Sequence, residues 1–182
     1  AAAHEPPPQV PVAAVFAERL GAVVAGSAGA IAIFAAFYMT TAFALAQATS
    51  QLGYARGPFL AVQLVSNLFY ALGIVLGAIR ADRASGGGAL AGGALGLALT
   101  GFVFGPGLAT GSLPIAALTL CATMLVLGLT NAALGPWLAS LFPLRLRYTG
   151  CSLAFNIGGI IGGALLPLVA QALSTAGHPG WT

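Results

Sequence analysis

The chain has 182 residues, of which 59% are hydrophobic and 5% are charged, and its mean hydropathy is +0.98. A soluble domain carries roughly 25% charged residues because its surface faces water, so these proportions exclude a soluble globular protein and predict one surrounded mostly by lipid. The net charge is +3, but the six basic residues are scattered among apolar runs and form no basic face with stacking aromatic side chains, so nucleic-acid binding is not expected.

No cofactor, metal site or catalytic residue is expected. Cys121 and Cys151 each lie inside an apolar run, where a small helix-packing residue is the simplest interpretation. His4 and His178 lie near opposite ends of the chain without a Cys or carboxylate cluster beside them. Catalysis would need a positioned nucleophile, base or metal, and no Ser/His/Asp or His/Cys set occurs, so an enzyme is not predicted.

Residues 1–19 are predicted to form a linker. The proline run at residues 6–8 favours a stiff, polyproline-like conformation, and a short turn at the membrane surface is expected to end at Glu18 and Arg19. No positively charged segment precedes an apolar core here, so a signal peptide is not expected. A chain that opens in a linker is expected to have been cut from a longer protein.

Five apolar runs follow the linker, and each reaches the roughly 17–25 residues that a membrane-spanning helix needs. None of them alternates like a strand, and lipid admits only helices or closed barrels as spanning elements. We therefore predict an all-α polytopic membrane protein with about five transmembrane helices, the third of which is closed by Gly105-Pro106-Gly107. The predicted helices cover about residues 20–48, 58–79, 89–105, 114–141 and 148–173.

The arginines predict the orientation of these helices. Cytoplasmic loops of membrane proteins carry an excess of basic residues. With five spans, Arg56 falls on one side of the membrane and the other arginines fall on the opposite side, which is expected to be the cytoplasm and to hold the N-terminal linker. These other arginines are Arg19, Arg80, Arg83, Arg145 and Arg147. Topology alone explains most of them, and the alternative is that they bind anions or form gates.

Small residues at four-residue spacing predict close helix packing in two of the helices. Such faces let backbones approach where no hydrophobic force drives helices together. The third predicted helix carries three of them on one face, which are Gly88, Gly92 and Gly96. The fifth carries two pairs, which are Gly158 with Gly162 and Gly159 with Gly163.

The five predicted spans contain no Asp, Glu, Lys or His at depth. Membrane proton relays and ion-pair sites normally need such a group, so this chain is expected to offer polar but uncharged contacts. Two interpretations stay open for these polar side chains: they touch solute along a water-filled path, or they bond neighbouring helices. The candidates for the path are Tyr38, Thr41, Gln63, Asn67, Asn131 and Asn156.

Two stretches resemble a known transporter family. Residues 77–83, Gly-Ala-Ile-Arg-Ala-Asp-Arg, resemble the cytoplasmic loop signature of the major facilitator superfamily. Residues 141–156 are similar to the stretch before and into the eleventh helix of the metabolite:proton symporters, the group that includes permeases for alpha-ketoglutarate, citrate, shikimate and proline/betaine. The residues of this loop that carry the likeness follow a Phe-Pro pair and include Arg145, Arg147, Tyr148, Thr149 and Gly150. The resemblance runs from about Ala22 to Trp181.

The resemblance implies that the five spans are helices seven to eleven, most of the C-terminal half of a symporter in a bacterial cytoplasmic (inner) membrane. Such a protein carries a small organic solute together with protons by alternating access around a midplane site. The partners implied are the solute, protons, the lipid bilayer and a missing N-terminal half, which would supply the proton-accepting carboxylate. Arg80, Asp82 and Arg83 would form a cytoplasmic gate, in which Asp82 bonds to a neighbouring helix end and Arg83 pairs with an acidic residue.

The chain departs from the family pattern at three places. Ala78 stands where the loop signature usually has glycine, residues 85–88 replace its basic cluster, and Ser140 replaces an acidic residue that often precedes the Phe-Pro pair. This eroded signature also fits a second hypothesis, a truncated membrane protein that does not transport, or a scaffold packed through its glycine faces.

Overall fold

The computed structural model describes residues 11–81 and 86–175, and every regular element in these ranges is a helix. The helices form five spans along the chain; two of these spans, called paths below, are interrupted by a π-helical turn, and three are continuous helices. The interrupted paths are α1 (Pro11–Tyr38), the first π-turn (Met39–Phe43) and α2 (Ala44–Ser50), and α6 (Leu144–Ile160), the second π-turn (Ile161–Leu165) and α7 (Leu166–Thr175). The simple helices are α3 (Arg56–Ala81), α4 (Gly86–Ala109) and α5 (Leu113–Ser140). These make five spans long and apolar enough to cross a membrane, which confirms the predicted all-α fold of an integral membrane protein.

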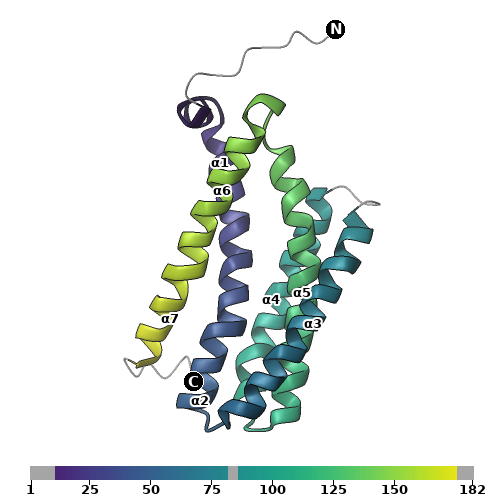
Figure 1. Ribbon diagram of the computed structural model, residues 1–182, viewed down its shortest axis with the longest axis vertical. Coiled ribbons are helices and arrows are strands. Elements are labelled where there is room, and N and C mark those ends of the chain that lie inside the picture. The colour runs from purple at the N-terminus through teal and green to yellow at the C-terminus, as the bar shows by residue number, and fades with distance from the viewer. Residues whose placement is uncertain (1–10, 82–85, 176–182) are drawn as a thin grey trace.

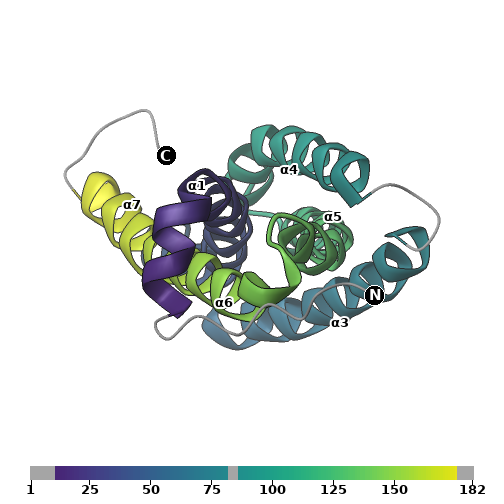
Figure 2. The same cartoon turned by 90° about the horizontal axis from the view of Figure 1, so that it is seen from above.

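The helices lie side by side along one long axis (Figure 1). Helices α3 and α4 both pack against α5, while α1 packs against α6 and the second π-turn and also contacts α5. Seen along the axis, α5 lies between α3 and α4 (Figure 2). The start of α1, the end of α3 and the α5–α6 turn share one end of the bundle, called the upper end here, and the α2–α3 and α4–α5 turns share the lower end (Figure 1).

The helical path of α1 begins at Pro11, inside the segment expected to be a linker, instead of at Leu20. Proline suits the first helical position because its missing N–H would have no partner there. Val15 has no exposed surface and packs with Phe142, which explains why this segment is held against the bundle. Arg19 breaks the helical geometry with φ −137° and ψ 32°, so the first turns of α1 bend away from its axis (Figure 1). The rest of the expected linker lies outside the described residues.

Helix α4 does not end at Gly105 as expected but continues through Pro106 to Ala109. The Tyr54 hydroxyl donates to the carbonyl oxygen of Leu108 at 2.8 Å. Carbonyls in the last turn of a helix lack an N–H partner in the same helix, so this bond from the α2–α3 connection satisfies one of them. The contact holds the last turn of α4 in place in spite of the proline.

The start of the last span also differs from its expected position. Helix α6 begins at Leu144 instead of at Tyr148, because Pro143 is extended, with φ −65° and ψ 155°, and the chain turns helical directly after it. The span is not a continuous α-helix, since the second π-turn interrupts it just before Pro167.

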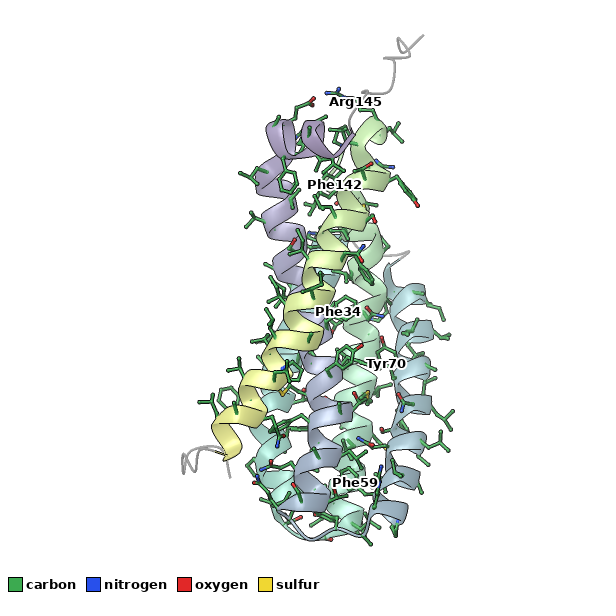
Figure 3. The ribbon with its side chains drawn as sticks, turned by 60° about the vertical axis from the view of Figure 1, so that its left-hand side comes forward. Phe34, Phe59, Tyr70, Phe142 and Arg145 are labelled. Atoms are coloured by element: carbon green, nitrogen blue, oxygen red, sulfur yellow. The ribbon has the colours of Figure 1, made fainter. Side chains whose placement is uncertain are left out.

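Three clusters of buried apolar side chains fill the bundle, and each lies at its own level. The lower cluster comprises Ala44, Ala48, Tyr54, Phe59, Leu108, Ala116 and Leu120. The middle cluster comprises Ala30, Ile33, Met124, Leu127 and Leu134. The upper cluster comprises Val15, Val23, Leu138, Phe142, Leu146 and Ala154. Figure 3 shows Phe59, Phe34 and Phe142 at these three heights. Among the described helices only α5 contributes to all three clusters, so it is the central helix of the fold.

The glycines of the last span lie against α1. Gly158 contacts Ala30, and Gly162 contacts the backbone carbonyl oxygen of Ile31. A methyl group added at Gly163 would lie 2.8 Å from the Tyr38 ring, and one at Gly159 would lie 3.6 Å from the Phe34 ring. Small residues at this interface therefore let two backbones approach closely, as such faces do in membranes.

The expected glycine face of α4 is used only in part within the described residues. A methyl group added at Gly92 would meet no atom there within 4 Å, and Gly88 is exposed. Gly96, which was expected on this face, lies against α5 together with Gly93: a methyl group at Gly93 would lie 2.5 Å from the Thr130 hydroxyl oxygen. Helix neighbours lie three as well as four residues apart, so the four-residue spacing alone did not fix the face.

The closest approach of α3 to α5 involves glycines on both helices. Gly73 and Gly128 face each other, and a methyl group added at Gly128 would lie 3.0 Å from the Gly73 Cα and in collision with the Tyr70 carbonyl oxygen. One turn along α3, a methyl group at Gly77 would lie 2.8 Å from the Leu129 carbonyl oxygen. Gly73 and Gly77 have the same four-residue spacing as the predicted faces, so the sequence contained a signal for this contact.

Candidate functional site

A polar and aromatic cluster joins three helices in the middle of the bundle. Asn131 Nδ2 on α5 donates to the Tyr70 hydroxyl oxygen on α3 at 2.8 Å. The Tyr70 ring lies 5.4 Å, centroid to centroid, from the Phe37 ring on α1. Figure 3 shows Tyr70 at a height between Phe59 and Phe142. Phe37, Tyr70 and Asn131, called the central cluster below, therefore bring an amide, a hydroxyl and two rings together at one level.

Gln63 binds α3 to the first π-turn. Its side chain is 8% exposed, and Nε2 donates to the Thr41 carbonyl oxygen at 2.6 Å and to the Thr40 carbonyl oxygen at 3.4 Å. The Thr41 carbonyl oxygen also accepts from the Ala44 N–H, so the Gln63 amide adds a second donor to this π-helical turn. The structure thus gives Gln63 a contact that bonds α3 to the neighbouring span.

The other candidates on α1 and α3 use their hydrogen bonds within their own helices. Asn67 Nδ2 donates to the Gln63 carbonyl oxygen at 2.9 Å. The Thr41 hydroxyl donates to the Phe37 carbonyl oxygen at 2.7 Å. Tyr38 stands beside the second π-turn and is the only one of these three residues that is exposed.

A groove of about 640 Å³ opens between α5 and α6 near the upper end. Arg147, Tyr148, Ser152 and Asn156 line it from α6 together with apolar side chains such as Phe155. Tyr148 is 89% exposed, whereas Asn156 Nδ2 donates to the Ser152 carbonyl oxygen at 2.8 Å. Among the described hydrogen bonds, none joins Asn156 to the central cluster, although Asn131 and Asn156 were both expected to line one path.

The upper end carries most of the described charges. Glu18 and Arg145 form an ion pair that joins the bent start of α1 to the start of α6. Arg147 Nε donates weakly to the Phe142 carbonyl oxygen at 3.4 Å, and Arg80 is exposed at the end of α3. Asp82 and Arg83 of the expected gate lie outside the described residues.

Gly150 lies directly beneath the Phe142 ring. A methyl group added there would lie 2.5 Å from the ring carbon Cε1, so only glycine leaves room for this aromatic side chain. Thr149 is half-buried beside it. The stretch after the Phe-Pro pair thus includes a glycine with a packing role at the α5–α6 turn.

The chain is similar to two curated proteins. It is 29% identical over 183 residues, 91% of this chain, to a Haemophilus influenzae protein whose name describes it as a metabolite transport protein. It is 35% identical over 74 residues, 41% of this chain, to the inner membrane metabolite transport protein YhjE of Escherichia coli. The chain spans 40% of the length of the first relative and 17% of the second. No protein-family model and no solved structure matches it.

The site has neutral groups at depth and charges only at helix ends. Among the described residues, the charged side chains belong to the first or last turns of spans or to the bent start of α1; they are Glu18, Arg19, Arg56, Arg80, Arg145 and Arg147. The central cluster can donate and accept hydrogen bonds and can stack on a flat or apolar group. It supplies no group able to exchange a proton near neutral pH.

Proposed function

We propose that this chain forms most of the C-terminal half of a major facilitator superfamily transporter that moves a small organic metabolite across a bacterial inner membrane. The observation that carries the proposal is the likeness to the Haemophilus protein, which covers 91% of this chain and 40% of that relative. The five spans of this chain correspond to 40% of the length of that relative. The remaining length is enough for a second half of similar size. The residue-level likeness in the two loops supports the same family.

In this proposal the bundle works by alternating access. It rocks against the missing half around a solute site near the midplane, to which Tyr70 and Asn131 contribute neutral hydrogen-bonding groups. The upper end faces the cytoplasm, because four of the five described arginines lie there and only Arg56 lies at the other end. Proton coupling needs a carboxylate from outside this chain, since the described spans hold none at depth.

An uptake experiment tests the function directly. Cells that express the complete gene are expected to accumulate at least one radiolabelled metabolite from a panel of carboxylates, betaines and neutral solutes, and a protonophore is expected to abolish the accumulation. Vesicles with an imposed proton gradient check the coupling separately. Transport that ignores the gradient would remove proton coupling alone, whereas no uptake of any solute by a folded, membrane-inserted protein would favour the non-transporting scaffold.

A second prediction separates solute contact from helix bonding at the central cluster. Asn131→Leu and Tyr70→Phe both remove the bond between α3 and α5, and interhelical bonds of this kind contribute about 0.6 kcal/mol, so both variants are expected to stay folded. Each variant also deletes a group placed in the solute site, the amide in Asn131→Leu and the hydroxyl in Tyr70→Phe, and each is expected to lower uptake about tenfold. Small losses of uptake in both variants would assign the pair to packing.

A further inference from the structure

The groove between α5 and α6 combines a cation, neutral polar groups and apolar surface. Arg147, Ser152 and Asn156 line it, together with the rings of Tyr148 and Phe155. Its volume of about 640 Å³ falls within the range of roughly 300–1,000 Å³ that is usual for small-molecule sites in proteins. The residues that line it include no carboxylate and share no member with the central cluster. The groove is therefore a separate, positively charged feature of the bundle.

Polar residues on the exposed side of α6 continue from its start into the span. Tyr148, Ser152 and Asn156 follow one another at four-residue spacing, and all three are exposed. Asn156 lies twelve residues beyond Leu144, which is about 18 Å along the helix axis. Its amide oxygen accepts no hydrogen bond from the described residues. A polar group at this depth is costly against acyl chains and normally faces a bundle interior or a water-filled cavity. The exposed polar residues therefore favour water, and not lipid, as the medium of the groove.

Arg147 brings a positive charge to the upper part of the groove. It is exposed, and its Nε donates weakly to the Phe142 carbonyl oxygen at 3.4 Å. Glu18 is the only carboxylate among the described residues, and it pairs with Arg145. A guanidinium group has five donors in a planar fork, so its two terminal nitrogens can bind one carboxylate through two parallel hydrogen bonds. The groove thus offers an anion a donor that no described acid occupies.

We propose that this groove is a binding site for a water-soluble organic anion at the upper end of the bundle, with Arg147 binding the carboxylate or a similar anionic group. The rings of Tyr148 and Phe155 contact the apolar body of the ligand, and the Ser152 hydroxyl hydrogen-bonds to its polar substituents. Rings of this kind bury a large apolar area, and tyrosine adds a polar group at its tip. The inference goes beyond the proposed function, because binding at this site requires no transport.

Cys151 reports on the charge of the groove, because it is a free cysteine among the lining residues. Its modification is measured on the complete protein in phosphatidylcholine nanodiscs with an anionic and a cationic methanethiosulfonate reagent, and peptide mass spectrometry assigns the label. Each rate is divided by the rate of the same reagent with a free thiol in solution. Altered reactivity of the thiol itself affects both reagents alike, so the ratio of the two corrected rates isolates the charge nearby. We expect the anionic reagent to be the faster one.

Substitutions at the two arginines of the first turn of α6 assign that charge. Arg147→Gln is expected to lower the ratio of anionic to cationic rate about tenfold, as expected for one unit charge within several ångströms at a protein surface. Arg147→Lys restores the charge and is expected to keep most of the ratio. Arg145→Gln is the matched control, because Arg145 does not line the groove, and it is expected to change the ratio less than about twofold.

Benzoate and benzamide test the ligand class in the unmodified protein, since they share one shape and differ in charge. Benzoate is expected to slow the modification of Cys151 by an uncharged maleimide in a saturable manner, and benzamide is expected to leave the rate unchanged. Arg147→Gln is expected to abolish the protection. Uptake is not measured in any of these experiments, so their failure would leave the proposed transport function untouched.

Four results would overturn the proposal. The first is a Cys151 thiol that no reagent reaches in the complete protein, because the groove would then be filled. The second is a rate ratio that Arg147→Gln does not change, and the third is protection that benzoate does not give or that benzamide gives equally. The fourth is protection that appears only when phosphatidylglycerol is added to the nanodiscs, which would assign the groove to an anionic lipid headgroup.

Discussion

Phe142→Ala is expected to lower the free energy of unfolding by about 3–5 kcal/mol, which is the usual cost of emptying a buried phenylalanine site. The Phe142 ring is 2% exposed and packs in the upper cluster with Val15 from the bent start of α1 and with Leu146 from α6. Its loss removes contacts from three segments at once. Reversible unfolding in mixed micelles with increasing amounts of a denaturing detergent measures the change.

The glycine beneath that ring allows a stricter test. Gly150→Leu alone is expected to destabilise the protein by about 1–3 kcal/mol or more, since the new side chain and the Phe142 ring would occupy the same space. In the double variant Phe142→Ala/Gly150→Leu the added leucine fills the space that the ring vacates. The measured loss of unfolding free energy in the double variant is therefore expected to be clearly smaller than the sum of the losses in the two single variants. Strict additivity would show that the two residues do not share one packing site.

The second large effect is expected at the crossing of α3 and α5. Gly128→Leu places a side chain against the backbone of Tyr70 and Ile74, with its first carbon 2.9 Å from the Ile74 nitrogen, and a helix backbone cannot move aside as a flexible side chain can. Overpacking of this kind costs about 1–3 kcal/mol and occasionally more, and here it should separate the two helices. We expect little monodisperse protein in size-exclusion chromatography and a sharply lower thermal midpoint.

Gly101→Leu is the matched control for that substitution. Gly101 also lies inside a span, on α4, but a side chain added there would meet no atom within 4 Å. Replacing glycine by leucine inside an exposed helix face is expected to be neutral or to stabilise the helix by up to about 1 kcal/mol. If Gly101→Leu harmed the protein as much as Gly128→Leu, the crossing of α3 and α5 would not be the cause.

The five spans could be predicted because lipid leaves few alternatives for long apolar runs, but their ends depend on contacts that hydropathy does not record. Pro106 would normally stop α4, and it is the hydroxyl of Tyr54, far away in the sequence, that supports the turn beyond it. Val15 belongs to the bundle because it is buried in the same cluster as Phe142, 127 residues further along the chain. Neither π-turn has a composition that separates it from ordinary helix.

Of the central cluster, only Asn131 was among the residues expected to line the path. Its partner Tyr70 lies 61 residues away in the sequence. The pairing depends on how far α3 and α5 are rotated about their axes, which the backbone contact at Gly73 and Gly128 sets. Gln63 was expected either to touch solute or to bond a neighbouring helix, and it donates to a backbone carbonyl oxygen in an irregular turn. Such acceptors cannot be seen in a sequence.

The confinement of charge to the helix ends has an electrical consequence. Carrying one elementary charge across a membrane potential of 100 mV changes its energy by about 2.3 kcal/mol. Among the described residues, every charge sits at a helix end or on the bent start of α1, and Glu18 is already paired with Arg145. A tilt of this bundle about its middle would therefore move almost no gating charge through the field. We therefore expect the described spans to contribute almost nothing to any voltage sensitivity of the protein.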